Sequence, residues 1–143
     1  MTRHRDLRFV IADDHRILRD AVKAILQERG YRVIGEASDG HEAIRLCREL
    51  APDLLLLDLS MPRLSGIDAA RKIAKDHPDT RIIVLSMHAE DRHIQESLQV
   101  GAVGYVSKSQ SASLLLEAIE TVCRGETYVS AKPVLPSFDQ PQA

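Results

Sequence analysis

The feature that most constrains the fold is an unbroken run of leucines at positions 54–57 that ends in a carboxylate, Asp58. Prolines at positions 52 and 62 bound this segment. A half-exposed strand alternates apolar and polar residues, whereas a strand covered by helices on both faces is apolar throughout. The run therefore predicts a buried strand of a parallel α/β sheet. Asp58 would lie at the carboxyl end of this strand, where open α/β sheets place their ligand sites.

Length, charge and composition limit the class of protein. A chain of 143 residues, 44% of them hydrophobic, can form one domain with a sizeable core. The net charge of −2 argues against a nucleic-acid-binding surface on this segment. No apolar stretch suits a membrane span or a signal peptide, so we expect a cytoplasmic protein with no membrane partner. Cys47 and Cys123 fall in helical patterns without CxxC spacing, and we expect small apolar side chains rather than a disulfide.

Strand and helix patterns alternate along the chain. Strands are expected at 9–12, 31–37, 54–58, 81–86 and 103–106. Apolar residues recur at helical spacing between and after them, and the helices are expected to stop at Gly30, Pro52, His77, Gly101 and Gly125. Strict alternation predicts an α/β fold, with a parallel sheet and helices on both faces. We expect an N-terminal extension at 1–7, one domain at 8–127 and a proline-rich linker or tail at 128–143.

Polar side chains follow four of the five expected strands. They are Asp13 and Asp14, Asp58, Ser86, and Lys108. If the first strand is central, all of them converge on one crevice. Three crowded carboxylates stay ionised only beside a cation, and oxygen ligands favour Mg²⁺, which often awaits a phosphate. Lys108 and Ser86 would contact that phosphate, and an aspartate can accept it as an aspartyl-phosphate. The sequence thus predicts a Mg²⁺-dependent phosphoryl site.

In order and spacing, these five residues resemble the receiver domain of two-component response regulators, over about residues 8–127. The resemblance implies a flavodoxin-like, doubly wound (βα)5 fold with a five-stranded parallel sheet of order 2-1-3-4-5. It implies that Asp58 takes a phosphoryl group from the phosphohistidine of a sensor histidine kinase. Mg²⁺ (or Mn²⁺) would be bound by Asp14, Asp58 and the backbone carbonyl of Ser60, with Asp13 acting through metal-bound water. Such a domain catalyses only its own phosphorylation and dephosphorylation and is not otherwise an enzyme.

The resemblance also assigns roles around the phosphoacceptor. Ser86 and Tyr105 would form the switch that responds to phosphorylation, with Tyr105 moving inward behind Ser86. Ser60, Met87 and His88 occupy positions that tune phosphate hydrolysis in the family. Many receivers have a proline and a cis peptide bond after the lysine, but Ser109 follows Lys108 here, so a cis bond is not expected.

Three segments, 12–19, 85–88 and 101–108, are similar to receivers of the NarL/FixJ type. These usually precede a LuxR-type helix-turn-helix domain that binds DNA, and we expect that output domain to be missing from this chain. DNA would be contacted only through it, in transcription regulation. The alternative is a stand-alone single-domain receiver. A homodimer formed on phosphorylation could use the first and last helices or the face from the fourth to the fifth helix, and the sequence does not decide between them.

Two other functions are open to a chain with this site. A phosphatase of the haloacid-dehalogenase type needs a second carboxylate two residues after its nucleophile, where this chain has Ser60. A phosphorylation-independent interaction module of receiver fold would tend to lose part of the acidic and basic set, which is intact here. His15 follows the acidic pair and could border the crevice, and we expect it to cap or pack rather than to serve as a phosphohistidine.

Overall fold

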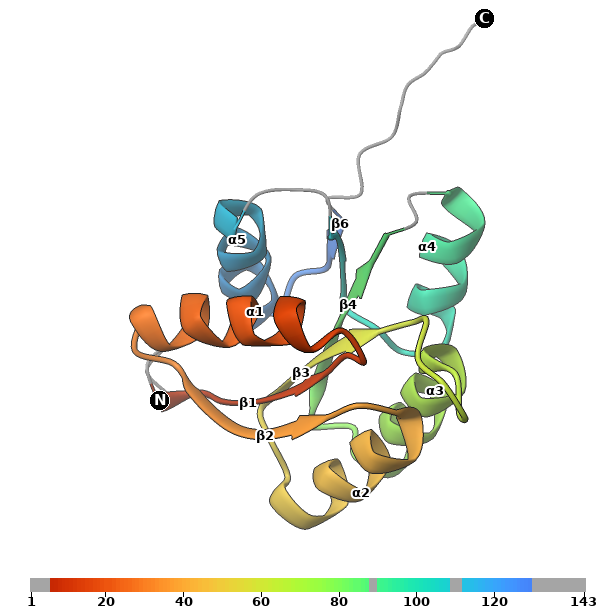
Figure 1. Cartoon of the computed structure of the whole chain (residues 1–143). Helices are drawn as coiled ribbons and strands as arrows, with labels where there is room; N and C mark the ends of the chain where they lie inside the picture. The colour runs from red at the N-terminus through yellow and green to blue at the C-terminus, as the bar shows by residue number, and fades with distance from the viewer. Residues whose placement is uncertain (1–5, 88–89, 109–111, 130–143) are drawn as a thin grey trace, which may run out of the picture.

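The strands form where the sequence is richest in apolar residues, and all of them join one parallel sheet. The computed structural model describes residues 6–87, 90–108 and 112–129. Their strands are β1 (Arg8–Ala12), β2 (Arg32–Ala37), β3 (Leu54–Asp58), β4 (Arg81–Ser86), β5 (Gly104–Ser107) and β6 (Tyr128–Val129). Their order in the sheet is β2-β1-β3-β4-β5-β6 (Figure 1).

Helices cover both faces of the sheet. They are α1 (Arg16–Glu28), α2 (Gly40–Leu50), α3 (Gly66–Asp76), α4 (Asp91–Gln99) and α5 (Ala112–Cys123). One core cluster joins the sheet to α2 and α3, with Ile94 of α4 packed against it, while a second joins the sheet to α1 and α5. Figure 1 shows the same division, with α1 beside α5 on one face and α2, α3 and α4 on the other. The predicted α/β fold and the strand order 2-1-3-4-5 are confirmed.

The leucine run takes the central place predicted for it. All five residues of β3 are buried, and the strand pairs with β1 on one side and β4 on the other. Leu55 and Leu57 enter the core cluster under α2 and α3, whereas Leu54 and Leu56 enter the cluster under α1 and α5. Because successive side chains of a strand point to opposite faces, an uninterrupted run is required to fill both clusters.

The sixth strand was not predicted. Tyr128 and Val129 pair in parallel with Gly104 and Tyr105 of β5, so the sheet includes the first two residues of the segment that we expected to be a linker. A strand of two residues, with Val129 45% exposed, carries no periodicity that a sequence pattern could reveal. The rest of that segment, 130–143, lies outside the described residues, and the predicted boundaries of the domain stay a prediction.

The two cysteines are free thiols, as expected. Cys47 belongs to α2 and is fully buried in the core cluster between α2 and the sheet, and burial raises the pKa of its thiol to about 12. Cys123 is half-buried, and burial raises the pKa of its thiol as well. None of the helices in the described part of the chain has the length and apolarity that a membrane crossing needs.

Candidate functional site

At the carboxyl ends of β1, β3 and β5, the side chains of Asp13, Asp58 and Lys108 are in direct contact. Lys108 Nζ lies 2.9 Å from Asp13 Oδ2 and 3.3 Å from Asp58 Oδ1. All three side chains are 2–3% exposed. Two buried carboxylates therefore share one buried ammonium group, which leaves one negative charge of the trio without a counter-charge.

The two oxygens of Asp58 differ in their surroundings. Oδ1 accepts a hydrogen bond from the Ser60 backbone N–H at 3.1 Å and contacts Lys108. Oδ2 is buried and has no hydrogen-bond partner among the described residues. Burial raises the pKa of Asp58, and the negative charge of Asp13 raises it further, against the opposing effects of the Ser60 N–H and Lys108. Asp58 therefore retains a buried oxygen that could accept another ligand.

Asp14 and His15 complete the rim of the site. Asp13, Asp14, His15 and Asp58 each offer a ligand atom, and these atoms all lie within 4.8 Å of one another. His15 is the N-cap residue of α1, but its side chain makes no capping hydrogen bond. Its Nδ1 instead lies 3.1 Å from Asp13 Oδ1 and 3.3 Å from Asp14 Oδ1. His15 therefore borders the crevice and begins the helix, but the expected side-chain capping is wrong, because the imidazole faces the carboxylates.

The donor set fits a divalent cation. Three carboxylates close together repel one another unless a cation shares their charge, and Mg²⁺ and Mn²⁺ bind carboxylate oxygen. The Oδ2 of Asp58, which none of the described residues hydrogen-bonds, is the kind of buried acceptor that such an ion would satisfy. Asp14 lies at the exposed rim, so the ion could keep water on its outer side.

The loop after β3 is held tightly against the phosphoacceptor candidate. A Cβ on Gly66 would lie 2.4 Å from the carbonyl oxygen of Asp58 and 2.5 Å from Cα of Leu59, so only glycine fits there without a shift of the backbone. The Gly66 N–H also donates to the Leu59 carbonyl at 3.1 Å. Arg63, with a positive φ of 65°, reaches Asp39 at the start of α2 with an N–O distance of 2.6 Å. The Leu59–Gly66 hydrogen bond thereby joins the two ends of the loop, and Arg63 attaches its middle to the start of α2.

Sequence reasoning missed Arg19 as a support of the site. Its Nη1 donates to the carbonyl oxygen of Asp13 at 2.7 Å, and its Nε donates to Glu36 at 3.0 Å. Lys23 joins Glu36 from the next turn of α1, with an N–O distance of 2.9 Å. The hydrogen bond from Lys23, together with that from Arg19, outweighs the burial of Glu36 and lowers the pKa of its carboxyl group. The only sequence signal was two basic residues one turn apart on the first helix.

Ser86 and Tyr105 lie together behind the site. Ser86, the last residue of β4, is 1% exposed, and its carbonyl accepts the Lys108 backbone N–H at 2.8 Å. Tyr105 of β5 is fully buried, and this burial raises the pKa of its hydroxyl group, against a side-chain hydrogen bond with Ser86 that lowers it. Ser60 is exposed and lies two residues after Asp58. Met87 is exposed and directly follows β4. His88 and Ser109 lie outside the described residues, as does the peptide bond that precedes Ser109.

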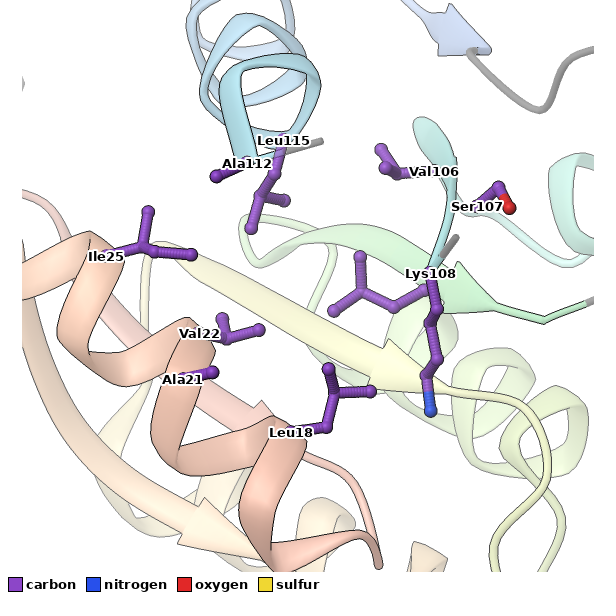
Figure 2. Close-up of a pocket in the computed structure, with 10 residues that line it drawn as sticks. Leu18, Ala21, Val22, Ile25, Val106, Ser107, Lys108, Ala112 and Leu115 are labelled. Atoms are coloured by element: carbon purple, nitrogen blue, oxygen red, sulfur yellow. The ribbon is translucent and has the colours of Figure 1, made fainter. Parts of the chain in front are cut away.

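An apolar cavity of about 110 Å³ lies next to the site, between α1 and α5. Figure 2 shows side chains of α1, among them Leu18 and Val22, on one side of it and Leu115 of α5 on the other. Lys108 also lines the cavity, and its stem runs from β5 towards α1 (Figure 2). The lysine therefore has an apolar wall along its stem and two carboxylates at its ammonium end.

The sequence profile of the response regulator receiver domain matches residues 9–120 of the chain. The chain belongs to the response regulator receiver domain family. This receiver domain is 38% identical to the response regulator UvrY of Escherichia coli over 123 residues, which are 85% of this chain and 56% of UvrY. It is 35% identical to the transcriptional regulatory protein DegU of Brevibacillus brevis over 127 residues, which are 88% of this chain and 54% of DegU. The receiver thus spans about half the length of these curated relatives.

Among solved structures, the receiver resembles a two-component response regulator of the LuxR family from an Aurantimonas species. The two are 36% identical, with a TM-score of 0.84, and the likeness covers 87% of this chain and 90% of the other. The predicted NarL/FixJ type is confirmed by this likeness and by the relatives above. The cluster of Asp13, Asp58 and Lys108 therefore lies within a response regulator receiver domain.

Proposed function

We propose that Asp58 is the phosphoacceptor of this receiver and takes a phosphoryl group from a phosphohistidine of a sensor histidine kinase. The observation that carries the proposal is the pairing of Asp58 Oδ1 with Lys108 and the Ser60 N–H, while Oδ2 has no hydrogen-bond partner in the described part of the chain. A structural aspartate at a turn would have both oxygens satisfied. Asp58 is instead held in place at one oxygen and free to bind at the other.

The transfer is a nucleophilic displacement at phosphorus. An Asp58 oxygen forms the new bond to phosphorus while the bond to the imidazole nitrogen of the kinase breaks, and that imidazole takes up a proton from solvent. The chain's own task is alignment and charge compensation, since phosphoryl transfer needs little else from the protein. Lys108 stays within ion-pair distance of the reacting carboxylate and meets the added phosphoryl charge.

Asp14, Asp58 and the backbone carbonyl of Ser60 would hold Mg²⁺ (or Mn²⁺), and Asp13 would contact it through water. A bound ion would supply positive charge that compensates the carboxylates and the phosphoryl oxygens beside Asp58. Asp13 has a separate role in this chain, because its Oδ2 fixes the Lys108 ammonium at 2.9 Å. Arg19 keeps Asp13 in position by binding its carbonyl oxygen at 2.7 Å.

Ser86 and Tyr105 are proposed to carry the phosphorylation signal away from Asp58. The Ser86 hydroxyl would bind a phosphoryl oxygen, which changes the hydrogen bond that it shares with Tyr105. Because Tyr105 is fully buried, a change in that bond alters packing in β5 rather than at the surface. Exchanges at Ser60, Met87 and His88 are expected to change the lifetime of the phosphoryl group.

The output is proposed to be transcriptional. The relatives UvrY and DegU are a response regulator and a transcriptional regulatory protein by name, and each is about twice as long as the matched segment. By analogy, a LuxR-type DNA-binding domain would follow this receiver, and phosphorylation would favour a homodimer. We place the protein in the cytoplasm, where the kinase and DNA are accessible.

The first experiment is the intact mass of the chain after incubation with a small acyl phosphate, with and without Mg²⁺. We expect a gain of one phosphoryl group that requires Mg²⁺ and is absent in Asp58→Asn. Asp53→Asn is the matched control, since Asp53 lies just before β3, at the other end of the strand from Asp58, and pairs with Arg8 there. No gain under any condition would refute phosphoacceptance and favour a phosphorylation-independent interaction module.

A further inference from the structure

His15 is placed among the acidic side chains by its own backbone. The His15 N–H donates to Asp13 Oδ1 at 2.8 Å, and this tight turn at the start of α1 directs the ring towards the carboxylates. Nδ1 then lies 3.1 Å from Asp13 Oδ1, 3.3 Å from Asp14 Oδ1 and 4.0 Å from Asp58 Oδ2. The receiver site therefore contains an imidazole nitrogen as well as carboxylate oxygens.

Nδ1 is within hydrogen-bond distance of Asp13 Oδ1, and its other distances also suit ligands of a single ion. Imidazole nitrogen and carboxylate oxygen bind transition metals at roughly 2.1 Å, so neighbouring ligand atoms around an octahedral ion lie roughly 3.0 Å apart and opposite ones roughly 4.2 Å. The separation of Nδ1 from Asp14 Oδ1, 3.3 Å, is close to that of neighbours, and its separation from Asp58 Oδ2, 4.0 Å, is close to that of opposite ligands.

A second observation points to a ligand in this space. The Asp58 side chain is 3% exposed, and its Oδ2, the oxygen nearer to His15, has no hydrogen-bond partner within the described part of the chain. A buried carboxylate oxygen left in this state costs stability unless a cation or a donor satisfies it. An ion between Asp58 Oδ2, Asp14 Oδ1 and His15 Nδ1 would satisfy the buried oxygen, and it would take the place of the proton through which Nδ1 contacts Asp13 and Asp14.

We propose that His15 Nδ1 is a direct ligand of the divalent ion at this site, which makes the site a mixed nitrogen–oxygen site selective for first-row transition metals. Imidazole binds Mn²⁺, Co²⁺ and Ni²⁺ progressively more strongly, whereas Mg²⁺ prefers oxygen and keeps its water. The inference rests on the proposed function only in placing an ion at Asp14 and Asp58, and it does not depend on phosphoryl transfer.

The test compares Ni²⁺ and Mg²⁺ binding by calorimetry, using the untagged chain and His15→Ala. The His15 side chain is 61% exposed, so its removal leaves the core intact. We expect His15→Ala to weaken Ni²⁺ binding at least about tenfold, a typical cost of losing a group that supports a metal, and to leave Mg²⁺ binding nearly unchanged. His41→Ala, at an exposed histidine of α2 outside the cluster, controls for incidental Ni²⁺ binding and should change neither affinity.

Pulsed electron paramagnetic resonance of bound Mn²⁺ gives an independent readout. The chain with its native His15 should show coupling to a directly bound nitrogen, and His15→Ala should lose it.

Equal losses for Ni²⁺ and Mg²⁺, no loss for either, or a nitrogen coupling that survives in His15→Ala would overturn the inference and leave phosphoacceptance by Asp58 untouched. Divalent binding that is unaffected by Asp58→Asn would refute both this inference and the proposed metal site. Metal binding as expected, with no phosphoryl gain, would refute phosphoacceptance alone.

Discussion

Replacing Asp58 by asparagine should stabilise the metal-free protein, although it removes the proposed phosphoacceptor. The carboxylate shares the ammonium group of Lys108 with Asp13, and no described residue makes a hydrogen bond to its buried Oδ2. An unsatisfied buried polar atom costs about 1–3 kcal/mol, and more where it carries charge. In Asp58→Asn, Lys108 and Asp13 would remain as a balanced pair at 2.9 Å. We therefore expect the free energy of unfolding to rise by about 2 kcal/mol in a metal chelator.

The dependence on pH follows from the raised pKa of Asp58, which burial causes first and the charge of Asp13 second. Because the folded protein holds the Asp58 proton to a higher pH than the unfolded chain does, the unfolded state binds fewer protons between the two pKa values. The contribution of Asp58 to stability is therefore present below the unfolded pKa and declines as the pH rises through the folded one. The Asn variant should lack this decline.

Urea unfolding in chelator, across a pH series from mildly acidic to neutral, measures both effects. Asp53→Asn is the contrasting variant, since it keeps an acceptor for the Arg8 backbone N–H but removes the ion pair with Arg8 Nε at 3.6 Å, and so it should not raise stability. Added Mg²⁺ should stabilise the parent chain but not Asp58→Asn, because only the parent keeps the ligand. An Asp58→Asn variant that is less stable than the parent in chelator at neutral pH would refute the account of the unbalanced charge.

Three further predictions concern the core and the loop around the site. Lys108→Met leaves two buried carboxylates facing one another, so stability in chelator should fall by about 3–5 kcal/mol; phosphoryl gain should also be lost, and an intact mass gain would contradict this. Gly66→Ala pushes a methyl group to 2.4 Å from the Asp58 carbonyl oxygen, which should cost about 1–3 kcal/mol in urea unfolding; unchanged stability would show that the loop moves freely. Cys47, with a pKa of about 12 and no exposure, should react with a thiol reagent at pH near 8 far more slowly than half-buried Cys123, and equal rates would contradict the packing under α2.

Much of the fold could be predicted because its signals are local. The run at 54–57 and its carboxylate indicate a central strand, and β3 fills both core clusters as that pattern requires. The meeting of Asp13, Asp58 and Lys108 followed from a general property of parallel sheets, whose strands all end at one edge. The residues at which the strands end can be located from the sequence, so a site formed by those residues can be predicted as well.

The unpredicted features depend on side-chain direction and on close approach between distant segments. The ring of His15 turns towards the carboxylates because its N–H binds Asp13, which its position before a helix does not reveal. Gly66 and Arg19 support the site through the carbonyl oxygens of Asp58 and Asp13, and a sequence pattern does not show which carbonyls a side chain or a glycine will approach. β6 is too short to carry a pattern at all.

The short strand β6 has a mechanical consequence for signalling. Val129 is the ladder partner of Tyr105, and Tyr128 is that of Gly104. The chain therefore leaves the sheet hydrogen-bonded to the strand that carries the buried tyrosine, and Tyr128 also donates to Glu117 of α5 at 3.1 Å. If the proposed switch displaces β5, Val129 would move with it, because the two strands share ladder pairs. In this arrangement, the exit of the chain is itself attached to the strand that the switch would move.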